Sequence, residues 1–179
     1  MKSKSQKIVA CALLTVLIAV GAFLRIPLPL PITFQLFFVV LGALLLGGRA
    51  GAVSSVLYMV IGLIGVPVFT QGGGIGYVLQ PSFGYIIGFI PAALIVGLIA
   101  GRSKNLSFTR ALLASFAGML VVYIIGTAYY YLIFRFVSGV ELGAWVLFTR
   151  CFLLVAPGDI LLCLVAATLC GRLKHLLPF

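Results

Sequence analysis

Long apolar runs, separated by only a few charges, constrain this chain more than any other feature of its sequence. Hydrophobic residues make up 64% of its 179 residues and charged residues 8%, and the mean hydropathy is +1.33. A helix needs about 20 apolar residues to cross a bilayer. The runs therefore predict an all-α integral membrane protein with six transmembrane helices, folded as a single domain over residues 1–179.

The positions of the runs give the predicted spans. They cover about residues 8–24, 33–48, 50–66, 83–100, 111–134 and 157–171. Between the fifth and sixth spans, residues 138–151 are amphipathic and carry Glu141, Trp145 and Arg150. This pattern is typical of a short helix lying on the membrane surface, here the outer one.

Lysines and arginines are concentrated on one side of the predicted topology. Nine lie near the termini or in alternate connections: Lys2, Lys4, Lys7, Arg49, Arg102, Lys104, Arg110, Arg172 and Lys174. Only Arg25, Arg135 and Arg150 fall on the other side. Because positively charged loops stay in the cytoplasm, both termini are predicted to be cytoplasmic, in the cell membrane. A nucleic-acid-binding protein would show a basic patch on one water-facing surface, so that class is excluded.

The sequence lacks the patterns that catalysis or cofactor binding would need. The four cysteines form no Cys-x-x-Cys pair, the single histidine is His175 in the predicted tail, and no phosphate-binding glycine–lysine loop is present. An intramembrane enzyme for lipid or prenyl substrates would need several acids, histidines or a metal site at depth, and one carboxylate alone qualifies. A purely structural subunit would not need the features that follow.

Pro157-Gly158-Asp159 lies between two apolar runs and holds one of only two acidic residues in the chain. A charged side chain at the centre of a membrane helix costs about 2.5–3.5 kcal/mol, so such residues usually have a function. Proline followed by aspartate is also an ordinary helix start, where the carboxylate lies near free N–H groups. Asp159 is therefore interpreted as a helix cap, a ligand-binding residue, or both.

Two of the predicted helices are too short to cross the bilayer. The helix from about Thr33 to Leu46 would be about 21 Å long and the helix from Pro157 to Gly171 about 22 Å, against roughly 30 Å of hydrocarbon. Both are expected to start below the outer surface, and the proline-rich segment 27–31 would dip inward to reach the first. Transporters use helix starts at such depth to bind polar substrate groups.

A glycine-rich connection, Val66–Ser82, completes the predicted outer cavity. It contains three consecutive glycines and no charge, and glycines let the backbone approach a ligand closely. A loop this long in a compact bundle is often functional, and a flexible connector is the alternative. Tyr123 and the run Tyr129–Tyr131 are interpreted as part of an aromatic belt at the outer interface.

Five motifs follow one another along the chain: Pro31-Ile32-Thr33-Phe34-Gln35, Gly62-Leu63-Ile64-Gly65-Val66-Pro67-Val68-Phe69, the glycine-rich connection, Pro81-Ser82-Phe83-Gly84-Tyr85 and Pro157-Gly158-Asp159. They resemble the BioY family, the biotin-specific substrate-binding (S) components of energy-coupling factor (ECF) transporters, from about residue 8 to residue 174. The resemblance implies a protein that captures biotin outside and delivers it inward. Its partners would be a transmembrane coupling protein and two ATP-binding subunits, because the chain has no ATPase of its own.

The same resemblance implies roles for individual residues. Asp159 would accept hydrogen bonds from the ureido N–H groups of biotin, Tyr85 would help to close over the ring system, and Gln35 would line the pocket. The glycine-rich connection would contribute Thr70, Gln71, Gly72 and Gly73. Biotin would be the transported ligand, and no cofactor is expected.

Two positions depart from the family's pattern. Family members commonly carry a lysine three residues after the aspartate, suited to the biotin carboxylate, and this chain has Leu162. Glycine-loop N–H groups, a recessed helix terminus or Arg150 would then bind the carboxylate, or the ligand would be a biotin precursor or another small vitamin. The family's Ala-xxx-Ala docking pair on the first helix appears as Ala12-xxx-Val16.

Overall fold

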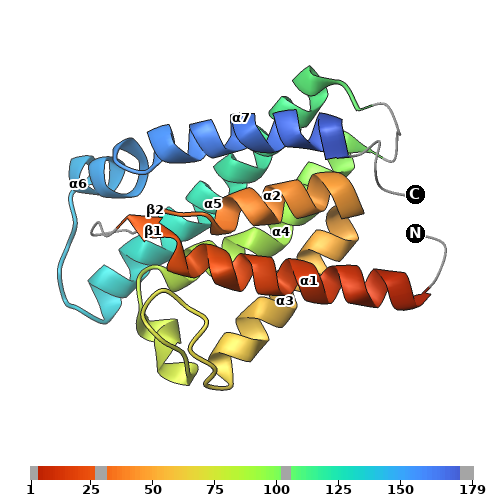
Figure 1. Cartoon of the computed structure of the whole chain (residues 1–179). Coiled ribbons are helices and arrows are strands. Elements are labelled where there is room, and N and C mark those ends of the chain that lie inside the picture. Colours follow the sequence, from red (N-terminus) through yellow and green to blue (C-terminus); the bar gives the residue numbers. More distant parts are fainter. Residues whose placement is uncertain (1–3, 27–31, 102–105, 174–179) are drawn as a thin grey trace.

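The computed structural model describes residues 4–26, 32–101 and 106–173, which form a helical bundle with one short β-ribbon (Figure 1). The proline-rich segment 27–31, His175 and four of the basic residues counted above lie outside the described residues. The elements are α1 (Lys4–Phe23), β1 (Arg25–Ile26), β2 (Ile32–Thr33), α2 (Gln35–Leu46), α3 (Gly48–Leu63), the 3₁₀ helix η1 (Ile75–Leu79), α4 (Phe83–Ala100), α5 (Phe108–Phe136), α6 (Ala144–Phe148), the π-helix η2 (Thr149–Leu153) and α7 (Ala156–Leu173).

Four segments of the described chain are long and apolar enough to cross a membrane, namely Lys4–Phe23, Phe83–Ala100, Phe108–Phe136 and Ala144–Leu173. The helices α2 and α3 are apolar but shorter. Many large apolar side chains face outward, and Leu98 and Ile8 are 78% and 70% exposed. An apolar surface of this kind fits lipid and not water, so the predicted membrane class is confirmed.

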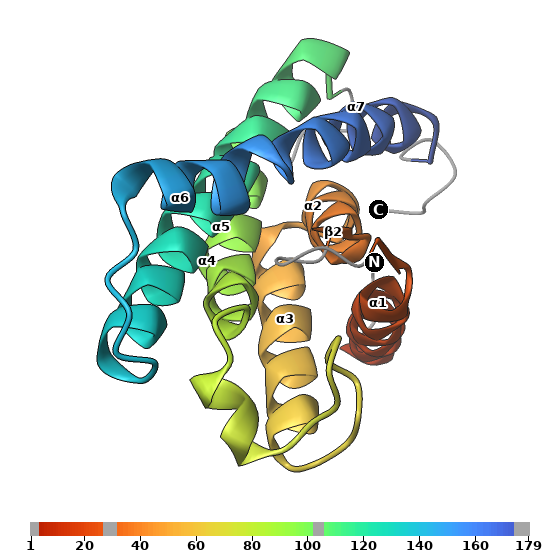
Figure 2. The ribbon, with the colours of Figure 1, turned by 90° about the vertical axis from the view of Figure 1, so that its left-hand side faces the viewer.

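Helix α2 lies in the middle of the bundle, in contact with α1, α3, α4 and α7 (Figure 2). Its buried residues include Val39, Val40 and Ala43, each with no exposed surface. The start of α1 and the end of α7 lie on one side of the bundle, together with the α2–α3 turn, while the β-ribbon and α6 lie on the opposite side (Figure 1). Residues at the start of α2 are therefore held between several helices, on the side of the β-ribbon.

Two glycines bring α4 and α5 close together beside the site. A Cβ atom added to Gly84 would lie 2.2 Å from the Cβ of Tyr129, and one added to Gly126 would lie 2.7 Å from the ring of Tyr85. Real Cβ atoms do not approach other atoms so closely. The missing side chains thus let the Tyr85 ring lie flat against the backbone of α5, which fixes its position.

Hydroxyl groups join α1 to α3. The Thr15 hydroxyl donates to the carbonyl oxygens of Cys11, at 2.9 Å, and Ser54, at 3.3 Å. Ala12 and Val16, also on α1, are exposed, the second of them by 57%. The predicted docking pair therefore lies on the outer surface of the bundle.

The β-ribbon replaces the first turn of the predicted second helix. β1 and β2 pair antiparallel, with Arg25 opposite Thr33 and Ile26 opposite Ile32. The Phe34 N–H then donates to the carbonyls of Gly21 and Leu24, and α2 begins at Gln35. The predicted helix start at Thr33 is wrong by two residues, because Thr33 pairs with β1 instead.

The last span also differs from the prediction. The chain is already helical in α6 and η2 before α7 begins at Ala156, so that Ala144–Leu173 forms one apolar segment of 30 residues. The Asp159 N–H donates to the Val155 carbonyl at 3.2 Å. This is the ordinary first hydrogen bond of a helix that begins at Ala156, one residue before the predicted start at Pro157, and the chain reaches this start through α6 and η2.

Candidate functional site

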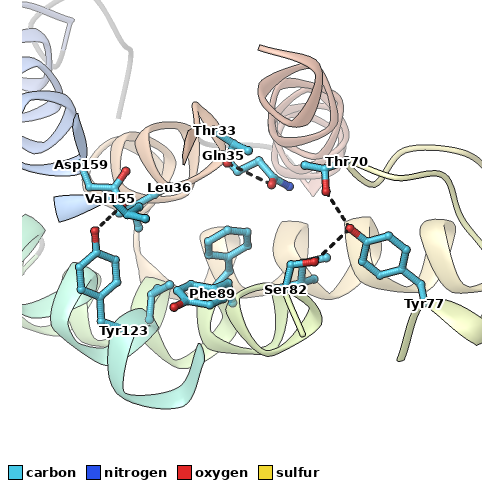
Figure 3. Close-up of a pocket in the computed structure, with 13 residues that line it drawn as sticks. Thr33, Gln35, Leu36, Thr70, Tyr77, Ser82, Phe89, Tyr123, Val155 and Asp159 are labelled. Atoms are coloured by element: carbon cyan, nitrogen blue, oxygen red, sulfur yellow. Dashed lines mark hydrogen bonds between the residues drawn. The ribbon is translucent and has the colours of Figure 1, made fainter. Parts of the chain in front are cut away.

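A cavity lies between β2, the glycine-rich connection and the helices α2, α4, α5 and α7. The space in which the centre of a water molecule fits has a volume of about 50 Å³. Most of its wall is aromatic or aliphatic, and its polar groups are hydroxyls, one amide and one carboxylate (Figure 3). The residues that line it are Thr33, Gln35, Leu36, Thr70, Tyr77, Ser82, Tyr85, Ile86, Phe89, Val122, Tyr123, Val155 and Asp159. Such a wall suits a small, largely apolar ligand with a few polar groups.

Asp159 is the charged residue in this wall, and it is only 5% exposed. Its Oδ2 accepts a hydrogen bond of 2.7 Å from the Tyr123 hydroxyl of α5 (Figure 3). No other hydrogen bond to this carboxylate comes from a side chain in the described part of the chain. A buried carboxylate needs more than one donor to offset its lost hydration, so Asp159 is suited to accept further hydrogen bonds from a ligand in the cavity.

Gln35, the first residue of α2, is held by hydrogen bonds on both sides of its amide. The Thr33 hydroxyl donates to Gln35 Oε1 at 3.2 Å, and Gln35 Nε2 donates to the Tyr58 hydroxyl at 2.6 Å. Tyr58 in turn donates to the Val68 carbonyl at 3.1 Å. This chain of bonds links the cavity wall to the glycine-rich connection and fixes the orientation of the amide.

The glycine-rich connection is folded against the bundle. The Phe69 ring is 1% exposed and packs against Tyr58, Tyr77 and Phe83, with ring centroids 4.4–6.3 Å apart. Positive φ angles of 114° at Gly72 and 102° at Gly74 turn the chain in a way that other residues rarely adopt. The alternative of a flexible connector is therefore wrong, because the connection has a packed core of its own.

Three hydroxyl groups of this connection meet at the cavity. The hydroxyls of Thr70 and Tyr77 are 2.8 Å apart, and those of Tyr77 and Ser82 are 3.3 Å apart (Figure 3). They come from positions before η1, within it and just before α4. The sequence analysis singled out Thr70 but not Tyr77 or Ser82.

The Tyr85 hydroxyl is the buried polar side-chain atom of the described residues that lacks a hydrogen-bond partner. Thr127 and Cys151 are neighbours of this group, but neither meets it at hydrogen-bonding geometry. An unsatisfied buried polar group costs about 1–3 kcal/mol. Tyr85 therefore contributes its ring to the cavity wall, while its hydroxyl is enclosed near Thr127 and Cys151.

The remaining predicted site residues do not line the cavity. Gln71 and Gly73 are exposed, and Gly72, which lies between them in the turn, is half-buried. Arg150 is exposed as well and lies near Tyr130 on α5. The structure thus brings Asp159, Gln35, Tyr85 and Thr70 together and leaves these other four outside.

The interpretation of Tyr123 and Tyr130 as interfacial aromatic residues is wrong. Their side chains are only 4% and 3% exposed, and Tyr123 bonds to Asp159. A sequence signal for this was available, because Tyr123, Gly126 and Tyr130 recur at helical spacing and so share one face of α5. That face also carries Met119 and Val122, which are buried.

The sequence of this chain is similar to those of known proteins. The model of the BioY family matches residues 1–179. A probable biotin transporter BioY from Lysinibacillus sphaericus is 47% identical over 131 residues, which cover 73% of this chain and 67% of the relative. The biotin transporter BioY of Thermotoga maritima is 37% identical over 123 residues, covering 68% and 72% of the two chains.

A solved structure is similar over nearly the whole chain. It is the crystal structure of the S-component for biotin from an ECF-type ABC transporter, with a TM-score of 0.78 and 26% sequence identity. The similarity covers 98% of this chain and 95% of that one. The helical arrangement around the cavity is therefore that of an S component.

Proposed function

The chain belongs to the BioY family, and from this we propose that it is the biotin-binding S component of an ECF transporter. It is a substrate-binding subunit and not an enzyme. The observation that carries this function is the buried Asp159 carboxylate, which faces a largely aromatic cavity and has a single side-chain donor in Tyr123. The bicyclic ring of biotin presents two ureido N–H donors and is otherwise mostly apolar, so it matches this wall.

Individual residues have distinct roles in this proposal. Asp159 accepts the ureido N–H groups, and the Tyr85 ring closes over the ring system. Gln35, oriented by Thr33 and Tyr58, and Thr70 line the remainder of the site. Gln71, Gly72 and Gly73 act through the shape of the connection and not by lining the cavity.

The orientation in the membrane follows from charge and topology. The α2–α3 turn with Arg49 and the start of α5 with Arg110 would lie in the cytoplasm together with both termini, in accordance with the distribution of basic residues. The β-ribbon and the glycine-rich connection would then lie on the outer side of the cytoplasmic membrane, and the cavity would open to that side. The proposed partners are a transmembrane coupling protein, which would contact the α1 face with Ala12 and Val16, and two ATP-binding subunits.

Equilibrium binding to the purified protein tests this function. We expect saturable, one-to-one binding of biotin in lipid nanodiscs without ATP or partner subunits, measured by isothermal titration calorimetry. A precursor that lacks the sulfur ring serves as the comparison, because Leu162 leaves a precursor as the second candidate ligand. Tighter binding of the precursor would reassign the substrate, and binding of neither compound would contradict the proposal.

A further inference from the structure

The carboxylate of a biotin-like ligand has no cationic partner among the residues that line the cavity. The charged group in the lining is Asp159, which has the same sign as the ligand's acid. Two carboxylates that share a small site of low polarity repel each other strongly. The ligand's acid must therefore lie away from Asp159, and Leu162 supplies no charge to bind it.

The cavity is polar at two separate ends. Asp159 and Tyr123 lie at one end, and Thr70, Tyr77 and Ser82 lie at the other, with Phe89 between them (Figure 3). Biotin has the same layout, because its ureido ring and its carboxylate are separated by an aliphatic chain. A ligand that places its N–H groups on Asp159 thus directs its acid toward the end formed by Thr70.

An arginine lies at this second end. Arg25 Nη1 donates a hydrogen bond to the carbonyl oxygen of Thr70, and Arg25 pairs with Thr33 across the β-ribbon. Thr70 and Thr33 both line the cavity. The backbone of Arg25 is held by its pairing with Thr33, and its guanidinium is held by the bond to Thr70. The guanidinium therefore lies beside the cavity, although Arg25 is not part of the cavity wall.

The other two arginines on this side of the molecule are engaged elsewhere. Arg135 lies 3.8 Å from Glu141 and donates to the Tyr131 hydroxyl at 2.9 Å. Arg150 lies near Tyr130. None of these three neighbouring residues lines the cavity, so Arg25 is the arginine of the three that is placed to meet the ligand.

We propose that Arg25 binds the carboxylate of the transported ligand while it holds the glycine-rich connection in place through Thr70. This inference rests on the proposed function. A guanidinium has five N–H donors in a planar fork, and the bond to Thr70 uses one of them. The remaining donors can form the paired hydrogen bonds that arginine makes with carboxylates. Arg25 thereby takes the role that Leu162 cannot perform in this chain.

Two ligands separate carboxylate binding from a purely structural role. Binding of biotin and of its neutral primary amide is measured by calorimetry for the unaltered protein, Arg25→Gln and Arg25→Lys. We expect Arg25→Gln to weaken biotin binding about ten- to a hundredfold and to weaken binding of the amide much less, because the amide loses only the support of the connection. Arg25→Lys keeps the charge and should retain more affinity for biotin than Arg25→Gln. The matched control is Arg135→Gln, which removes an outer arginine away from the cavity and should change neither affinity.

The other outcomes overturn the inference. An equal loss of affinity for biotin and its amide in Arg25→Gln would show that Arg25 only holds the connection. Unchanged biotin binding in Arg25→Gln would show that another group binds the acid. If the unaltered protein bound biotin's amide but not biotin, the acid would have no partner at all. Failure of the unaltered protein to bind either compound would instead contradict the proposed function, and this inference with it.

Discussion

Asp159 is a buried carboxylate in the first turn of α7, and its contacts bear on the cap and ligand roles predicted for it. Its burial in an apolar segment would be unfavourable without donors, and the Tyr123 hydroxyl supplies one at Oδ2. Its N–H bonds to Val155 within the continuous winding that leads into α7. Among the described residues the carboxylate accepts a hydrogen bond from Tyr123 and none from the first turn of α7, so the cap role is not observed and the ligand-binding role stays a prediction.

Replacement of Asp159 by asparagine tests this role. The variant has nearly the same shape but lacks the charge, and hydrogen bonds to charged groups contribute about 1.5–3 kcal/mol. We expect biotin binding to weaken about ten- to a hundredfold in calorimetric titrations. Glu141→Gln is the matched control, because Glu141 is the other carboxylate of the chain and its side chain is 81% exposed beside Arg135. Equal affinities for Asp159→Asn and the control would leave Asp159 without a role in binding.

Residues of the site differ in how far the sequence predicted them. Asp159 was identified because a carboxylate is rare among apolar residues, and Gln35 because it follows a helix-breaking segment. Tyr123 and Arg25 were missed because their roles depend on contacts with residues 36 and 45 positions away. No local pattern contains that information.

At the scale of elements, the glycine-rich connection positions one end of the cavity. The buried Phe69 side chain holds the connection against the bundle, and the Gly74 N–H donates to the Gly62 carbonyl at 2.7 Å. Gly73 lies between these two contacts. A Cβ atom at Gly73 would lie 2.3 Å from the carbonyl oxygen of Val66, which is backbone and cannot rotate away.

Alanine at this position is expected to disturb the connection and leave the helices intact. We expect Gly73→Ala to weaken biotin binding about tenfold or more, because a clash with backbone typically costs more than 1 kcal/mol. The helical circular dichroism signal should not change. Gly76→Ala is the control, since a Cβ there would meet no atom within 4 Å. Equal binding by the two variants would show that the connection adapts freely and does not shape the site.

The sequence predicted helices better than their ends. The span 83–100 coincides with α4, because a proline precedes it and a glycine follows it. The start of α2 was displaced by pairing between β1 and β2, whereas α7 begins within one residue of its prediction but is preceded by the unpredicted winding of η2. Both effects depend on hydrogen bonds that apolar patterning does not record. The 3₁₀ turn η1 was missed for the same reason.

At the scale of the whole molecule, the arrangement separates the ligand site from the ends of the chain. The cavity lies toward the side that carries the β-ribbon, and the start of α1 and the end of α7 lie on the opposite side (Figure 1). Helix α1 contributes to both functions in the proposal, because its outer face carries Ala12 and Val16 and its end leads into Arg25. Ligand capture and partner docking would thus involve the end and the middle of one helix.

The structure of the complex with biotin, determined by cryo-electron microscopy or crystallography, tests the central claim most directly. The account predicts that the ureido nitrogens lie within hydrogen-bonding distance of the Asp159 carboxylate. It also predicts that the biotin carboxylate lies at the opposite end of the cavity, beside Thr70 and Arg25. Density for biotin in the reverse orientation, or at a site that Asp159 does not line, would contradict it.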